Sequence, residues 1–112
     1  MAITLVTGSA TIGVTEFWLA SNSTTKTDQT DDAIHQDWVD FGNMAAGDVY
    51  EWRLVEKVNA GTQRDVLVGR IVGAQGSPLI LTGFLLAEGW ELGVKKISGT
   101  DRVINWSIRK VA

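Results

Sequence analysis

The sequence predicts an all-β domain, an antiparallel β-sandwich or barrel of about seven or eight short strands. Two observations support this class. Apolar and polar residues alternate along several segments rich in β-branched and aromatic residues, as expected for strands with one buried face. Clusters of Gly, Asn, Ser, Thr and Asp interrupt these segments about every 8–12 residues, which is typical of the turns in such folds. With 112 residues, 45% of them hydrophobic, the chain should form a single domain over residues 1–112.

The clearest alternation lies near the C-terminus, in residues 89–109. Its apolar positions are Trp90, Leu92, Val94, Ile104, Trp106 and Ile108. Because all of them are even-numbered and a turn cluster separates the two runs, the segment predicts a β-hairpin with both tryptophans on the buried face. This pairing requires a loop with an odd number of residues, such as 98–100, in which Gly99 or a neighbour can take a positive φ. The intervening polar residues, Glu91 among them, should face solvent.

The remaining strands are expected at residues 3–12, 16–20, 33–41, 49–58, 65–72 and 79–86. A bulge at Gly8 and Ser9 is expected in the first of them. The polar segment 21–32 should form the longest loop. Residues 33–41 also have apolar spacing that suits a helix, but their β-rich neighbours favour a strand. Residues 79–86 form a continuous apolar run, which predicts a strand covered on both faces, in the core or at a subunit contact.

The net charge of −3 is unevenly distributed. Residues 1–50 hold seven acidic residues and one basic residue, a balance of −6, whereas residues 51–112 hold six acidic and nine basic residues, a balance of +3. A chain without a dominant basic surface is not expected to bind nucleic acid. No signal peptide and no bilayer-spanning segment is recognisable, so we expect no membrane association and synthesis as a soluble protein in a cytoplasm.

The residues that usually carry chemistry are sparse. His35 is the only histidine and there is no cysteine, so the spacing of a zinc site is missing. No nucleophile elbow is present, and His35 is expected at the surface or as a cap rather than in catalysis. The acidic run at 28–32 lacks the features of an EF-hand loop, and residues 73–77 lack the lysine of a P-loop. We therefore expect no enzymatic activity, no catalytic residue, no cofactor and no metal.

Five tryptophans are many for a chain of this length. Three of them alternate with polar residues as core positions do. The expected core positions around these three are Tyr50, Trp52, Leu54, Trp90 and Trp106. Trp18 and Trp38 are expected to be more open and to suit a subunit interface. An exposed row of tryptophans would instead favour a carbohydrate- or peptide-binding module.

Several motifs resemble a group of small proteins encoded among the virion genes of tailed bacteriophages. This group commonly carries a Gly-Trp-Asp-Val-Thr-like strand, a Gly-Thr-Asp-Arg turn and a Trp-Ser-Ile-Arg end. The matching segments are residues 89–96, 99–102 and 106–109, with further similarity at 37–42 and 50–58. The likeness spans about two thirds of the chain and is strongest in the C-terminal segment. Glu91 and Gly93 stand where the group usually has Asp and Thr, a change that should matter little on a solvent face.

The resemblance implies a non-enzymatic virion component made in the cytoplasm of a bacterial host. Its role would be structural: a capsid decoration (cement) protein that stabilises the head or, alternatively, a tail or connector component. It also implies a homo-oligomer that contacts the major capsid protein or tail proteins.

A protein of this kind acts through surface area, so the apolar residues left over after the core is filled should mark its contacts. The N-terminal segment 3–6 is a candidate for adding a strand to the sheet edge of a neighbour, because no charge occurs before Glu16. The expected interface residues are Ile3, Leu5, Val6, Trp18, Trp38, Leu79, Ile80, Leu81, Phe84 and Leu85.

Overall fold

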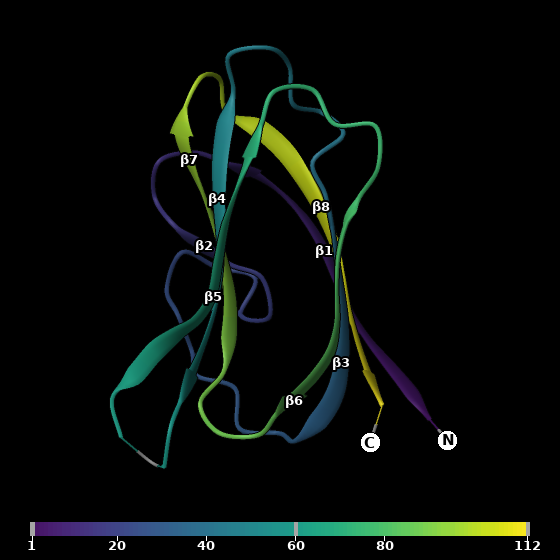
Figure 1. Cartoon of the computed structure of the whole chain (residues 1–112), viewed down its shortest axis with the longest axis vertical. Coiled ribbons are helices and arrows are strands. Elements are labelled where there is room, and N and C mark those ends of the chain that lie inside the picture. The colour runs from purple at the N-terminus through teal and green to yellow at the C-terminus, as the bar shows by residue number, and fades with distance from the viewer. Residues whose placement is uncertain (1, 60, 112) are drawn as a thin grey trace.

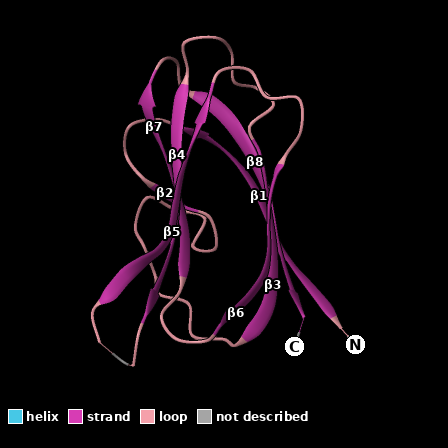
Figure 2. Cartoon of the chain, viewed as in Figure 1, coloured by secondary structure: helices cyan, strands magenta, loops and turns pink. Residues whose placement is uncertain are grey.

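The computed structural model describes residues 2–59 and 61–111, which form eight β-strands in two antiparallel four-stranded sheets (Figure 1). The strands are β1 (Ile3–Ile12), β2 (Phe17–Trp18), β3 (Ala33–Asp40), β4 (Val49–Lys57), β5 (Gln63–Val72), β6 (Leu79–Leu86), β7 (Glu91–Ser98) and β8 (Arg102–Val111). Sheet A has the order β1-β8-β3-β6 and sheet B the order β2-β7-β4-β5. The two sheets face each other as layers, and loops make up the rest (Figure 2). The predicted all-β sandwich is confirmed.

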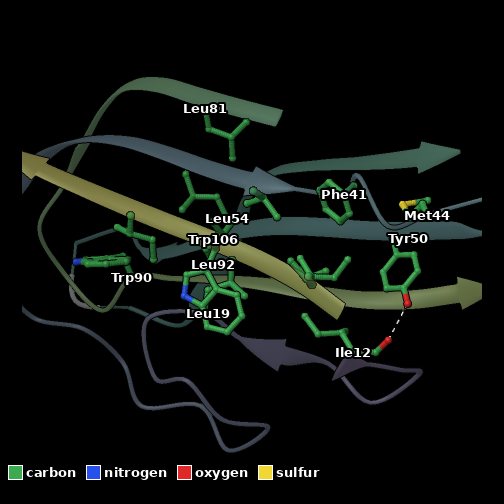
Figure 3. Packing of buried hydrophobic residues seen from close by; sticks show 14 of the residues in the cluster. Ile12, Leu19, Phe41, Met44, Tyr50, Leu54, Leu81, Trp90, Leu92 and Trp106 are labelled. Carbon is green, nitrogen blue, oxygen red and sulfur yellow. Dashed lines mark hydrogen bonds between the residues drawn. The ribbon is translucent and has the colours of Figure 1, made fainter. Parts of the chain in front are cut away.

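The core lies between the two sheets, where every second residue of most strands points inward. Trp90, Trp106 and Tyr50 belong to this core, and each is almost completely buried (Figure 3). Trp52 is only half-buried and packs against the edge of the core. The alternation therefore placed the expected core positions on the correct face, because strand geometry sends successive side chains to opposite sides.

The predicted hairpin at residues 89–109 is wrong. β7 pairs with β2 and β4 in sheet B, whereas β8 pairs with β1 and β3 in sheet A, so the two strands form an arch between the layers. An arch and a hairpin both turn the two apolar faces toward the core, so the alternation cannot distinguish them. What the alternation does predict correctly is the burial of Trp90 and Trp106.

The turn of this arch is held by partly buried polar contacts. Gly99 has φ 95°, as expected for the turn, and a Cβ at this position would lie 2.7 Å from the Cα of Asp48. The Thr100 backbone N–H donates to the Asp48 carboxylate at 2.9 Å, and the Arg102 N–H donates to the Tyr50 hydroxyl at 2.8 Å. The turn is thereby tied to the start of β4, on the opposite side of the core from β8.

Two other local expectations have different outcomes. Residues 33–41 do form a strand, β3, over Ala33–Asp40. The bulge expected at Gly8 is absent, because β1 and β8 keep one register through all ten of their residue pairs. Gly8 has another role: the Trp106 indole lies against its backbone, and a Cβ there would be 2.7 Å from Trp106 Cε2.

The apolar run at 79–86 forms β6, which is an edge strand of sheet A. Within the chain only one face of β6 is covered, so the expectation of a strand buried on both faces by this chain does not hold. Leu81 and Leu86 point into the core, while Ile80 and Leu85 are exposed on the outside. A register shift opposite His35 and Gln36 places the extra residue of β6 near Gly83, which has φ 80°.

Candidate interaction surface

The outer face of sheet A carries a row of apolar side chains across all four of its strands. Leu85 on β6 lies opposite Ile34 on β3, Ile34 lies opposite Val111 on β8, and Val111 lies opposite Ile3 on β1. Leu85 is 77% exposed and Ile3 is 62% exposed. The row crosses the end of sheet A where the N- and C-termini lie (Figure 1). Directly opposed side chains in neighbouring strands are in contact range, so the four residues form one continuous apolar strip.

The same face is almost free of charge. The outward-facing residues are Ile3, Leu5, Thr7, Ser9, Thr11, Ile34, Gln36, Trp38, Asp40, Ile80, Thr82, Leu85, Val103, Asn105, Ser107, Arg109 and Val111. Only Arg109 and Asp40 among them are charged. The Arg109 guanidinium lies 4.0 Å from the centre of the Trp38 ring, and the Asp40 carboxylate accepts a hydrogen bond from the Gly42 N–H at 2.8 Å. Both charges are thus engaged with neighbours of their own chain.

The outer face of sheet B has the opposite character. Arg53 Nε lies 2.9 Å from a carboxylate oxygen of Glu16, and Glu51 forms ion pairs with Arg70 at 3.1 Å and Lys95 at 3.8 Å. Exposed residues of β5 such as Val68 lie among these ion pairs. A sheet face that is laced with ion pairs is typical of solvent contact, whereas a face of hydroxyl, amide and apolar groups is typical of contact with protein.

The apolar strip of sheet A is bordered by two shallow hollows. One, of about 310 Å³, lies between β1, β8, β3 and β6 and is lined by Ile3, Gln36 and Arg109 among others. The second, of about 420 Å³, lies where Leu85 and Ala87 leave the sheet. Ile34 and Val111 line both hollows. The strip residues therefore line these hollows and offer a partner hollowed as well as apolar surface.

The structure divides the expected interface residues into two sets. Those on the outer face of sheet A are Ile3, Leu5, Trp38, Ile80 and Leu85. Those that do not lie there are Val6, Leu79 and Phe84, which point inward and pack against the core, Leu81, which is buried in it, and Trp18, which is buried on the outer face of sheet B opposite Gly93. The inward residues have little or no surface to offer a partner, because alternate residues of one strand cannot share a face. Ile34 and Val111, which complete the strip, were not expected there. Only the pairing of β3 with β8 places them opposite each other on this face.

Trp18 is not open, as had been expected, but 6% exposed. Its ring is covered by the Lys26 ammonium, 5.0 Å from the ring centre, and by the Arg53 guanidinium at 5.1 Å. Gly93 on the neighbouring strand leaves room for the ring, since a Cβ there would lie 2.7 Å from Trp18 Cζ3. Lysine and arginine stems cover apolar surface in this way while their charges stay near water.

The expectation that His35 lies at the surface is also wrong. His35 points inward from β3 and is 1% exposed. Its Nδ1 lies 3.1 Å from Oδ1 of Asp37, which is fully buried, and its ring meets the Trp90 ring edge-on at 4.4 Å between centres. His35 Nε2 and Asp37 Oδ2 have no hydrogen-bond partner among the described residues. The side chains of the pair are enclosed between the two sheets.

Glu91, expected on a solvent face, is buried with its carboxylate fully used. Its two oxygens accept hydrogen bonds from the backbone N–H groups of Ala20, Ser21 and Leu92 at 2.8–3.0 Å and from the Ser21 hydroxyl at 2.5 Å. Burial raises the pKa of the Glu91 carboxyl, and these hydrogen bonds act in the opposite direction. The carboxylate fixes the start of the long loop that follows β2.

Asp48 is a second buried carboxylate that organises loops. It accepts hydrogen bonds from the N–H groups of Thr100 and Ala45 at 2.9 Å and from Arg102 Nε at 2.7 Å. Chiefly through the two backbone donors, and then through Arg102, these contacts lower the pKa of Asp48 to about 2. Asp48 and Glu91 therefore serve the fold rather than an exposed site.

Two further classes of site are absent from the part of the chain that the structure describes. No group of three or more His, Cys, Asp or Glu side chains there could hold a metal ion. No helix of residues 2–59 and 61–111 has the length and apolar character needed to cross a membrane. Comparison of the chain with protein-family models, with curated proteins and with solved structures gave no match. The class that fold and surface define is a β-sandwich with one ion-paired and one nearly uncharged outer sheet face.

Proposed function

We propose that this chain is a structural component of a tailed-bacteriophage virion, with a capsid decoration (cement) protein as the first candidate, and that it acts through the outer face of sheet A. One observation carries the proposal: the apolar strip of Leu85, Ile34, Val111 and Ile3 on a sheet face with almost no charge. The motif resemblance described above supplies the setting of a virion. No cofactor, metal or catalytic group takes part in such a role.

The exposed apolar area of this strip favours contact with a partner. Burial of apolar surface contributes about 25 cal/mol per Å², and a small domain leaves much of its apolar surface uncovered unless it meets a neighbour. Leu85 and Ile3 are mostly exposed, and the face around them has few charges that would have to be dehydrated on contact. A partner that covers this face gains apolar contact at little electrostatic cost.

A tail or connector component would use the same surface, and the copy number per particle separates the two roles. A decoration protein covers the capsid lattice and is present in hundreds of copies, whereas a tail or connector ring has tens or fewer. The carbohydrate-binding alternative is not favoured by the tryptophans. Trp18, Trp90 and Trp106 are buried, Trp52 is half-buried, and Trp38 lies under Arg109.

The test is Leu85→Glu, with Val68→Glu as the matched control on the outer face of sheet B. Both side chains are exposed, so both variants should fold with wild-type circular dichroism. In virions assembled with each variant in place of the wild-type chain, Leu85→Glu should reduce the number of copies per particle several-fold, and Val68→Glu should not. Quantitative mass spectrometry of purified particles measures the copy number. Wild-type incorporation of Leu85→Glu, or absence of the wild-type chain from particles, would contradict the proposal.

A further inference from the structure

The four sheet edges of the molecule are protected to different degrees. β2 is only two residues long, and its free side is closed by the chain's own loop, through a pair of backbone hydrogen bonds between Trp18 and Ser23. β5 carries charged residues and a register shift, and β6 carries a register shift near Gly83. Charges, bulges and short length are the devices that keep sheet edges from pairing with other chains.

β1 has none of these devices. It runs for ten residues, Ile3–Ile12, without a charge, a proline or a register shift. Its backbone is hydrogen-bonded to β8 on one side only, and no other described residue forms a backbone hydrogen bond with residues 3–11. This also corrects the expectation of a free N-terminal arm, because residues 3–6 already belong to the chain's own sheet. What remains open is the outer edge of a long, regular strand.

We propose that β1 pairs antiparallel with β1 of a second copy of this chain, which joins the two A sheets into one continuous eight-stranded sheet across a twofold axis. The charge pattern points to a second copy. In a twofold pairing every residue meets a symmetry-related part of the same strand, so charges on it would be brought close to equal charges. β1 carries no charge, so this repulsion does not arise on it; β6 is uncharged too, but the register shift near Gly83 interrupts its edge. The dimer would also join the nearly uncharged outer faces of two A sheets into one surface.

The register follows from the faces of the strand. Outward residues must meet outward residues, so the numbers of paired residues must add to an even sum and the axis must pass through a residue paired with its own copy. Residues 3–11 are the open part of the edge, since the Ile12 carbonyl already accepts a hydrogen bond from Tyr50. Full overlap of 3–11 places the axis at Thr7. Leu5 then lies opposite Ser9 of the second copy.

The test uses the purified chain and does not depend on a virion, so it can fail or succeed independently of the proposed function. At several hundred micromolar, the wild-type protein should sediment with twice the mass of one chain. Thr7→Lys and Thr7→Glu place equal charges opposite each other at the axis. Each variant alone should raise the dimer dissociation constant on the order of tenfold, and an equimolar mixture of the two should regain the dimer because Lys then faces Glu. Ser77→Lys, at an exposed loop position, is the matched control and should leave the dimer unchanged.

A single cysteine provides a second, geometric measurement. Because the chain has no cysteine, Thr7→Cys carries one thiol, and directly opposed residues of antiparallel strands lie within disulfide distance. Mild oxidation should convert Thr7→Cys, but not Ser77→Cys, to a covalent dimer on a non-reducing gel. Wild-type protein that stays monomeric at several hundred micromolar would overturn the inference, as would dimers that Thr7→Lys and Thr7→Glu leave intact. Circular dichroism of each variant confirms that the monomer is folded.

Discussion

The contact between Gly8 and Trp106 allows a sharp test of the packing between β1 and β8. The two residues are directly opposed in the register, and both point inward. A Cβ added at Gly8 would lie 2.7 Å from Trp106 Cε2 and closer still to Cζ2. The indole also packs on Phe17, with 5.5 Å between ring centres, so it cannot move away without disturbing sheet B. Gly8→Ala should therefore overpack the core.

The effect of Gly8→Ala on the free energy of unfolding should depend on whether the Trp106 indole is present. In the wild-type chain Gly8→Ala should lower the free energy of unfolding by about 1–3 kcal/mol, the usual cost of overpacking. Trp106→Ala should lower it by about 3–5 kcal/mol, because it removes a large buried side chain. In the Trp106→Ala background the new methyl group enters vacated space, and Gly8→Ala should be neutral or stabilise by up to about 1 kcal/mol. The double variant should thus be more stable than the sum of the single effects by about 1–4 kcal/mol.

Urea unfolding of the four proteins, followed by far-ultraviolet circular dichroism, measures this coupling without relying on tryptophan fluorescence. The control is Asn105→Ala, next to Trp106 on the outward face of β8, which should have the same small effect with and without the Gly8→Ala change. Equal destabilisation by Gly8→Ala with and without the indole would refute the packing argument.

Three further predictions concern the buried polar groups. Glu91→Gln should lower the free energy of unfolding by about 2–4 kcal/mol in chemical denaturation, because an amide cannot accept all the hydrogen bonds that the carboxylate accepts. The pKa of Asp48 is lower in the folded chain than in the unfolded chain, so its stabilisation is present above about pH 4 and is lost as the pH falls toward about 2. Asp48→Asn should remove this part of the acid sensitivity, which thermal unfolding between pH 2 and 5 would detect; an unchanged pH profile would contradict it. Replacing Asp37 alone by Leu leaves His35 Nδ1 without its partner and should cost about 1–3 kcal/mol, whereas replacing both by Leu should cost less than the sum of the single changes in a double-mutant cycle.

The alternation of residue types by itself determined the all-β class and the inward face of most strands. Trp90 and Trp106 were correctly predicted as core residues because period-two spacing is a local property of an extended chain. A positive φ was expected at Gly99 or a neighbour, since short turns require such a residue, and Gly99 takes it, although the turn joins two sheets instead of closing a hairpin. Both predictions depend only on neighbours in the sequence.

Which strand pairs with which was decided only by the tertiary structure. β7 and β8 follow each other across a short turn, yet they lie in different sheets, and the contacts that hold this arch come from Asp48 and Tyr50, about fifty residues earlier. The burial of His35 and Glu91 has the same origin. His35 Nδ1 has its partner in Asp37 and the Glu91 carboxylate has its partners in the loop after β2, and the sequence pattern does not reveal either arrangement.

The outer face of sheet A shows most clearly which features follow from the sequence pattern and which depend on the tertiary structure. Residues 79–86 are apolar at nearly every position, so no alternation in the sequence shows that Ile80 points outward and Leu81 inward. The extra residue near Gly83 then shifts the alternation within β6, which turns Leu85 outward. Apolar composition is a property of the chain, but the side of the sheet that each residue occupies depends on the register with β3, and register is set by contacts between strands far apart in the sequence.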